Sequence, residues 1–300
     1  MYVLLGSNGK ITSKIARLLL AQGKSVRVVG RSRQGLDALR EAGAEPAVGA
    51  VEDVAFLIAA FRGAEAVYTM LPPVYGSSAP LADYTRLGDA IARAVAASGV
   101  GRVVNLSSTG AHLPKGTGPI VGLHDQEQRL NALADVKILH LRPGYFFENH
   151  FNAIGLIKAH GIYSDLIEPD APIPSIGTSD IATVAARELV SPGSAAERRV
   201  LHLRGPKSYT PTEAAKLLGR AIGQPDLRYV RAEPAQAKAG MVLHGISPPM
   251  ADLLAEMSEA FARAEFIAES LAGPTETTPT ELEQFGPIFK AAYENTAAGQ

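Results

Sequence analysis

The chain has 300 residues, of which 46% are hydrophobic and 20% charged, and its formal net charge is -1. This composition is typical of a water-soluble globular protein, and the lack of a basic surplus argues against a nucleic-acid partner. The sequence has no cysteine, which excludes disulfides, thiolate nucleophiles and cysteine metal sites. Its apolar runs fall short of the ~18 residues of a membrane-spanning helix, and the first residues lack the charged region of a signal peptide. We therefore expect a cytoplasmic protein that has no membrane partner.

The first half of the chain alternates short apolar runs with longer amphipathic ones. Strands are predicted at Tyr2–Leu5, Ser25–Val29, Glu45–Val48, Ala66–Met70, Arg102–Leu106 and Lys137–Leu141. The first intervening helix is predicted over Lys10–Gln22, followed by Gly23 as a suitable C-terminal cap. Nearly continuous apolar strands are typical of a parallel sheet covered on both faces. The pattern therefore predicts an α/β fold with a doubly wound parallel Rossmann sheet.

After about Tyr145 the pattern changes, and the last part of the chain becomes mainly helical. Ala251–Leu271 and Pro279–Tyr293 have the helical patterns. We predict a dinucleotide-binding domain over residues 1–150 and a smaller, mostly helical substrate lobe over residues 151–300. Because late segments of such folds often return to the main sheet, the boundary between the two parts is not sharp.

A glycine-rich segment joins the first predicted strand to the first predicted helix. It reads Gly6-Ser7-Asn8-Gly9-Lys10-Ile11. Glycine permits a tight turn and lets backbone N–H groups approach a pyrophosphate, while the N-terminus of the following helix adds partial positive charge. Within a strand–turn–helix unit that leads to a second strand, the segment predicts a dinucleotide site rather than a plain glycine turn.

The end of the second strand indicates which dinucleotide binds. Arg31 and Ser32 stand where an acidic residue would bind the ribose 2′-hydroxyl of NADH. A guanidinium forms bidentate, charge-assisted hydrogen bonds with phosphate, and a hydroxyl adds another donor. The sequence therefore favours NADPH as the cofactor. The alternative is that Arg31 and Arg33 only solvate a loop.

The order of several segments resembles the NmrA-like branch of the atypical short-chain dehydrogenases. These segments are Gly6-x-x-Gly9, Arg31, Ala66–Pro73, His124-x-x-Glu127-x-x-Leu130, Leu141–Asn149 and Ser179–Ala182. The resemblance implies NADPH binding and, in some members, reduction of quinones, azo dyes or triphenylmethane dyes. Other members are regulators that bind the dinucleotide without known turnover.

The resemblance also implies positions for parts of the cofactor. Met70-Leu71-Pro72 is expected beside the nicotinamide ribose, and Pro143 and Tyr145 are expected near the nicotinamide ring. Two positions depart from the family pattern. Thr12 replaces the third glycine, and the segment from Gly49 to Val51 lacks the acidic residue that often lies near the adenine.

The catalytic pair of typical short-chain dehydrogenases is missing. Those enzymes use a serine with a Tyr-x-x-x-Lys pair, and this chain has His124 and Gln128 at the two positions of the pair. Ser107 and Ser108 are candidates for the serine, and His124 is the best acid/base candidate because its ordinary pKa lies near neutrality. We predict Ser107 and His124 as catalytic residues. The alternative for His124 is that it caps or orients a helix.

The remaining polar residues give weaker predictions. Glu127 is expected to be structural and to bond backbone or Arg142, and the other histidines show no metal-ligand spacing, so no metal site is predicted. Residues 72–80 and 109–123 are predicted to form the substrate mouth. The aromatic residues Tyr75, Tyr145, Phe146 and Phe147 are candidates to stack on a flat acceptor, with the core of the second lobe as the alternative for the two phenylalanines.

These features predict an NADPH-dependent reductase that transfers hydride to a quinone or another conjugated or aromatic acceptor. Such an acceptor needs little protonation, so it suits a site without the Tyr–Lys pair. An NADPH-sensing regulator with little turnover is the main alternative, and a sugar epimerase or dehydratase is disfavoured by the same loss. The expected partner is a small-molecule substrate, and a homodimer is compatible with the sequence.

Overall fold

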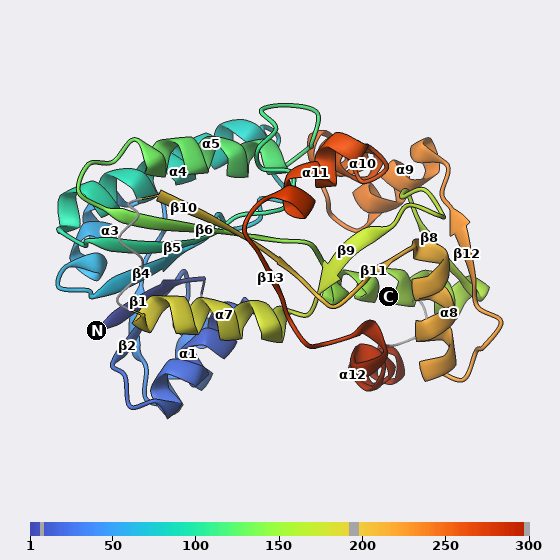
Figure 1. Cartoon of the computed structure of the whole chain (residues 1–300), viewed down its shortest axis with the longest axis horizontal. Coiled ribbons are helices and arrows are strands. Elements are labelled where there is room, and N and C mark those ends of the chain that lie inside the picture. Colours follow the sequence, from blue (N-terminus) through green and yellow to red (C-terminus); the bar gives the residue numbers. More distant parts are fainter. Residues whose placement is uncertain (7–8, 192–197, 297–300) are drawn as a thin grey trace.

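The computed structural model describes residues 1–6, 9–191 and 198–296. Its central element is a parallel sheet built from β1 (Tyr2–Leu5), β2 (Val26–Gly30), β3 (Glu45–Val48), β4 (Ala66–Thr69), β5 (Arg102–Leu106), β6 (Lys137–Pro143), β10 (Arg198–Arg204) and β13 (Thr275–Thr277). Within the described residues the strand order is β13-β10-β6-β5-β4-β1-β2-β3 (Figure 1). The six strands predicted from the sequence all form, within two residues of their predicted bounds. The predicted α/β fold with a doubly wound parallel sheet is confirmed.

Helices cover both faces of this sheet (Figure 1). The helices of the first half of the chain are α1 (Thr12–Ala21), α2 (Asp37–Glu41), α3 (Val54–Phe61), α4 (Pro80–Ser98) and α5 (Ile120–Asn131), and η1 (Gln34–Leu36) is a short 3-10 helix. Helix α7 (Thr178–Val190) lies beside α1 on one face, and α3, α4 and α5 lie on the other. This double cover explains why the strands are apolar on both sides.

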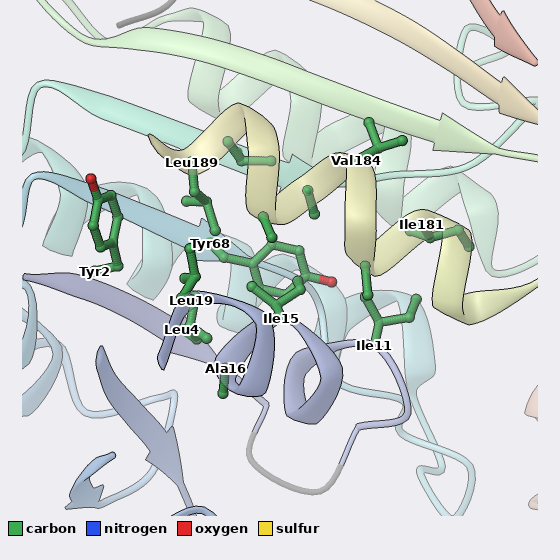
Figure 2. Packing of buried hydrophobic residues seen from close by; sticks show 14 of the residues in the cluster. Tyr2, Leu4, Ile11, Ile15, Ala16, Leu19, Tyr68, Ile181, Val184 and Leu189 are labelled. Carbon is green, nitrogen blue, oxygen red and sulfur yellow. The ribbon is translucent and has the colours of Figure 1, made fainter. Parts of the chain in front are cut away.

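Alternate residues of β4 show how the two cores are divided. Tyr68 belongs to the core between the sheet and α1 with α7, and its ring lies beside Ile15, between these two helices (Figure 2). Val67, one position earlier, belongs to the core on the opposite face. Successive side chains of a strand point to opposite faces, so one short apolar run supplies both cores.

The second lobe contains short strands as well as helices. Its elements are β7 (Tyr145–Phe146), η2 (Phe147–Ala153), α6 (Ile154–His160), β8 (Ile162–Asp165), β9 (Ile173–Ile176), β11 (Ser208–Tyr209), α8 (Pro211–Ala221), β12 (Arg228–Arg231), α9 (Pro234–Leu243), α10 (Pro248–Ala260), α11 (Ala264–Ala272) and α12 (Leu282–Asn295). The strands pair as β11-β9-β7 and β12-β8. Phe147, Phe285 and Phe289 are buried in its core.

Segments from the second half also complete the main sheet. Strand β10 pairs with β6, and β13 pairs with β10, both in parallel register. The helical stretch predicted over Ala251–Leu271 is interrupted between α10 and α11, where Phe261 packs against Tyr145 and Arg263 donates a hydrogen bond to the Gly116 carbonyl. No helix of the described part of the chain is long and apolar enough to cross a membrane.

Candidate active site

The turn after β1 has the geometry that only glycine allows. Gly6 has a φ of +92°, and a Cβ at this residue would lie 3.2 Å from both the Met70 sulfur and the Thr12 hydroxyl oxygen. The N–H group of Gly9 donates to the Gly6 carbonyl at 3.1 Å and closes the turn. Met70, at the end of β4, therefore lies beside the glycine-rich segment, as the predicted cofactor site requires.

Helix α1 begins directly after this turn. Ile11 precedes its first residue, and among the described residues no side chain caps this end of the helix, so none of them competes with a negatively charged ligand there. The exposed Lys10 places its ammonium group 4.6 Å from the centroid of the Phe151 ring, between the segment and the second lobe. Ser7 and Asn8, which were also predicted to contact the cofactor, lie outside the described residues.

The departure at Thr12 has a structural explanation. The Thr12 side chain is buried, and its hydroxyl donates to the Leu5 carbonyl at 2.9 Å. Because Leu5 is the last residue of β1, this hydrogen bond ties the first turn of α1 to the strand. Threonine is therefore accommodated here because its one polar group has a buried partner.

The end of β2 presents an exposed positive charge. Arg31 and Ser32 are both exposed, and Arg31 forms no ion pair within the described residues. The Ser32 hydroxyl oxygen accepts from the Gly35 N–H at 3.3 Å, which leaves its own hydrogen free to donate. Both side chains are thus accessible at the position where the sequence predicts contact with the additional phosphate of NADPH.

The end of β6 is held between two sheets. A Cβ at Gly144 would lie 2.2 Å from the Pro174 carbonyl oxygen, so β9 approaches the backbone here more closely than any side chain allows. Pro143 is the buried last residue of β6, and Tyr145 pairs with Ser175 in the smaller sheet. Leu71 is buried and Pro72 half-buried at the neighbouring end of β4. The glycine turn, the uncapped helix and the exposed Arg31 together fit a bound dinucleotide.

Ser107 is part of a buried ionic network. Its hydroxyl donates to the Glu127 carboxylate, which Arg142 also holds through hydrogen bonds of 2.9 and 2.5 Å from Nε and Nη2. Burial alone would raise the pKa of Glu127, but the hydrogen bonds from Arg142 and Ser107 and the positive charge of Arg142 hold it below its ordinary value. Glu269 on α11 binds the same guanidinium. The expected structural role of Glu127 agrees with these contacts.

This network determines whether the Ser107 hydroxyl is free to donate a hydrogen bond to a substrate. The carboxylate of Glu127 is ionised and accepts the Ser107 hydrogen, so the hydroxyl is not free to donate to a substrate oxygen in this arrangement. The neighbouring Ser108 donates to the Thr109 carbonyl at 2.9 Å. Neither serine therefore offers an unengaged donor.

His124 is half-buried in α5 and contacts the loop that follows β5. Its Nδ1 lies 2.8 Å from the Ala111 carbonyl oxygen. A carbonyl oxygen only accepts, so Nδ1 carries a hydrogen and donates it to Ala111. Gln128, at the position of the usual lysine, is exposed. The two residues thus do not form an acid pair.

Comparison with known proteins identifies the family. A family model described as NAD(P)H-binding matches residues 6–189, which is well over half of the chain. The chain belongs to the NAD(P)H-binding, NmrA-like family of atypical short-chain dehydrogenases. The predicted resemblance is confirmed, and binding of NAD(P)H follows from family membership together with the geometry at Gly6 and α1.

Three known proteins resemble this NmrA-like protein. A (4-alkanoyl-5-oxo-2,5-dihydrofuran-3-yl)methyl phosphate reductase from Streptomyces griseus is 27% identical over 260 residues, covering 86% of each chain. The NADPH complex of a quinone oxidoreductase from Escherichia coli has a TM-score of 0.77 at 21% identity and covers 96% of this chain and 99% of that one. The NADP(H) complex of a Citrobacter triphenylmethane reductase has a TM-score of 0.76 at 16% identity and covers 96% of this chain and 100% of that one. The two structures show that the fold is shared.

A second buried network of polar side chains, which the sequence does not predict, links three strands of this NmrA-like protein by hydrogen bonds. Thr69 donates to Asn105 at 2.9 Å, Asn105 donates to His140 Nδ1 at 3.1 Å, and His140 Nε2 lies 3.1 Å from the Asn131 oxygen. Burial lowers the pKa of His140 to about 4, so the ring is neutral near pH 7. These contacts satisfy polar groups inside the sheet. The described residues contain no cluster of three side chains that suits a metal ion.

The second lobe contains a polar cluster that sequence reasoning also missed. His150 Nδ1 lies 2.5 Å from the Tyr163 hydroxyl, and these two residues line a cavity of about 20 Å³ with Tyr145, Asp165 and Tyr229. A volume of this size holds about one water molecule. Burial lowers the pKa of His150 to about 3 and raises the pKa of Asp165, so both groups favour their neutral forms. The cluster depends on the pairing of β8 with β12, for which the sequence carries no local signal.

The aromatic candidates for the acceptor site separate into two groups. Phe147 is fully buried in the core of the second lobe, and Phe146 packs against the core beneath α7. Tyr75, in the loop after β4, is 52% exposed, and Tyr145 is half-buried beside Phe261. Tyr75 is therefore the most exposed of the four candidate rings, while Tyr145 and Phe146 are half-buried.

Proposed function

We propose that this protein is an NADPH-dependent reductase of quinones or other conjugated or aromatic acceptors. Membership of the NAD(P)H-binding family supports the cofactor class, and the relatives described above are reductases or oxidoreductases. The bound dinucleotide supplies the hydride. What this chain supplies is a binding site for the dinucleotide and an acceptor site next to it, in a soluble, cytoplasmic setting.

The preference for NADPH rests on the end of β2. Arg31 is exposed there without an ion-pair partner among the described residues, and no acidic residue stands beside it. A guanidinium pairs with the additional phosphate of NADPH, whereas NADH would leave that charge unused. We assign Gly6, Gly9, Lys10, Ile11, Met70, Leu71, Pro72, Pro143 and Tyr145 to the rest of the dinucleotide site, with Ser7, Asn8 and Ser32 as further contacts.

The observation that carries the acceptor class is the engaged state of Ser107. Its hydroxyl donates to Glu127, while His124 Nδ1 donates to Ala111. An ordinary ketone develops negative charge on one oxygen during reduction and needs a strong donor at that atom. A quinone or an enone spreads the same charge over its own π system. Conjugated acceptors therefore suit a site whose serine and histidine hydrogens are already used.

The relative from Streptomyces griseus supports the same class of acceptor. Its name describes reduction of an oxo-dihydrofuran that carries an alkanoyl group, which is a conjugated, electron-poor ring. The relatives from Escherichia coli and Citrobacter are named for quinones and triphenylmethane dyes, which are also extended π systems. The common feature of these names is an acceptor that delocalises charge.

A regulator that binds NADPH without turnover is the second candidate. The same engaged serine favours it, because a sensor needs a dinucleotide site but no proton donor. Consumption of NADPH in the presence of a quinone, a triphenylmethane dye, an enal and a saturated ketone, with NADH as the control cofactor, separates the two. Turnover of the conjugated acceptors with NADPH supports the reductase. Tight NADPH binding without turnover of any acceptor supports the sensor.

A further inference from the structure

Two connecting segments of the second lobe enclose a hollow that lies outside the dinucleotide site. One segment joins β8 to β9, and the other joins α10 to α11 and continues into α11 (Figure 1). The hollow has a volume of about 440 Å³, within the range of about 300 to 1,000 Å³ of small-molecule sites. Its apolar lining includes Ala171, Phe261 and Ile267, and its charged residues are Glu168, Asp170 and Arg263.

The apolar wall of the hollow is fixed by the protein itself. Phe261 packs edge-on against Phe266 with ring centroids 4.8 Å apart, and both belong to a buried cluster that includes Ala171 and Ile173. Side chains held in this way keep their positions without a ligand. The hollow therefore offers a preformed apolar surface, which reduces the entropic cost of binding.

The same wall borders the candidate active site. The Phe261 ring contacts the Tyr145 ring, with centroids 5.7 Å apart and planes at 81°. Arg263 donates a hydrogen bond to the Gly116 carbonyl, in the loop that follows β5. The segment between α10 and α11 thus has the predicted substrate mouth on one side and the hollow on the other.

The charges around the hollow leave one carboxylate unpaired. Glu168 binds Arg231 at 2.7 Å, and Arg263 binds Glu265 at 3.4 Å. Asp170 is exposed, and its side chain has no ion-pair or hydrogen-bond partner among the described residues. An apolar wall beside an unpaired carboxylate is complementary to a ligand that combines apolar surface with positive charge.

We propose that this hollow binds an aromatic or alkyl group that carries a positive charge, such as a protonated amine. The proposal deepens the proposed function, on which it rests for the identity of the ligand. Since Phe261 separates the hollow from Tyr145, the bound group is the end of the acceptor that is remote from the reduced atoms. The site then selects elongated acceptors with a cationic end.

The test uses acridine orange, a flat aromatic cation, as the probe for the full-length protein without dinucleotide. Fluorescein, a three-ring dye of similar size with negative charge, is the control probe. We expect saturable acridine orange binding that Asp170→Asn weakens about three- to fivefold, the scale of an exposed ion pair. Ala264→Trp, which fills the hollow from an exposed position, weakens it by about tenfold or more. Asp226→Asn, a matched removal of an exposed carboxylate between α8 and β12, leaves it unchanged.

Three results overturn the proposal. They are equal affinity of wild type, Asp170→Asn and Ala264→Trp for acridine orange, tighter binding of fluorescein than of acridine orange, and displacement of the dye by NADP⁺. The far-UV spectrum of each variant confirms that it is folded. Dye binding needs no turnover, so its failure with intact quinone reduction rejects the hollow alone. Intact dye binding without reduction of any acceptor rejects the proposed function alone.

Discussion

Ser107, which directly follows the buried strand β5, donates its hydroxyl hydrogen to Glu127 on α5. The serine that a short-chain dehydrogenase would direct at its substrate is thereby joined to the structural framework. Arg142 holds the same carboxylate from β6 and also binds Glu269 on α11. The Glu127 carboxylate thus sets the orientation of the serine, and the Arg142 guanidinium attaches α11 to the sheet.

Removing the charge of Glu127 is expected to destabilise the fold. In Glu127→Gln the buried Arg142 keeps Glu269 but loses its main partner, and breaking a buried pair from one side costs about 3–5 kcal/mol. Urea unfolding at pH 7 measures the change. Asp125→Asn, two residues earlier on the same helix and without a side-chain hydrogen-bond or ion-pair partner among the described residues, is the matched control. A loss below about 1 kcal/mol in Glu127→Gln contradicts the assigned role.

The same pair predicts a pH dependence of stability. The folded-state pKa of Glu127 lies below its ordinary value of 4.5. A lowered carboxylate pKa contributes stability that is present above the unfolded-state value and is lost as pH falls through the folded-state value. The wild type is therefore expected to lose stability below about pH 4.5, and Glu127→Gln to lose less over the same window. Unfolding curves measured from pH 7 to pH 3 check this, and parallel pH profiles would argue against it.

Arg31→Ala is expected to remove most of the preference for NADPH. The wild type is expected to bind NADPH at least about tenfold more tightly than NADH, because a set of charged hydrogen bonds contributes roughly 1.5–3 kcal/mol. Calorimetric titration of both variants with both cofactors gives the four affinities. Arg40→Ala, an exposed arginine on α2 that already pairs with Asp37, serves as the control. Equal affinities of the wild type for NADPH and NADH would overturn the cofactor assignment.

Gly9→Val is expected to abolish dinucleotide binding while the protein still folds. A Cβ at Gly9 would lie 3.2 Å from the Gly6 carbonyl oxygen, and the branched side chain would also block approach of the pyrophosphate. Gly101→Val, where a Cβ meets no atom within 4 Å, is the control. Normal NADPH binding by a folded Gly9→Val variant would place the phosphate site elsewhere.

His124 is expected to act mainly by orienting α5 and the loop after β5. Because its Nδ1 hydrogen is donated to Ala111, His124→Ala lowers the free energy of unfolding but keeps most of the turnover per folded molecule. Gln128→Ala, on the exposed side of the same helix, is the control. The pH dependence of turnover distinguishes the roles: a loss of about 100-fold together with a changed pH profile would instead identify His124 as an acid.

The sequence predicts those parts of this fold that depend on local patterns. The six apolar runs become strands because both faces of a parallel sheet are buried, and Gly6 is recognisable because its turn tolerates no side chain. The direction of the Ser107 hydroxyl is not local, since it depends on Glu127 and Arg142, which come from α5 and β6. Its engagement could therefore not be read from the serine itself.

Contacts between distant segments explain the remaining misses. The Tyr163 ring contacts the Tyr229 ring because β8 pairs with β12, and no residue spacing in the sequence predicts that pairing. The break between α10 and α11 falls in a stretch with good helical composition, where contacts of Phe261 with Tyr145 and of Arg263 with Gly116 outweigh local propensity. Both features belong to the second lobe, where the acceptor site is proposed.

The most direct test of the account compares cyclohexenone with cyclohexanone under NADPH. The two molecules differ by one conjugated double bond, so their kcat/KM ratio reports how much the site depends on charge delocalisation in the acceptor. We predict reduction of the enone at least about 100-fold faster than reduction of the ketone, because one strong donor at a developing oxyanion contributes about that factor. Equal rates for the two, or efficient oxidation of cyclohexanol with NADP⁺, would show that the protein supplies a strong acid and would contradict the account.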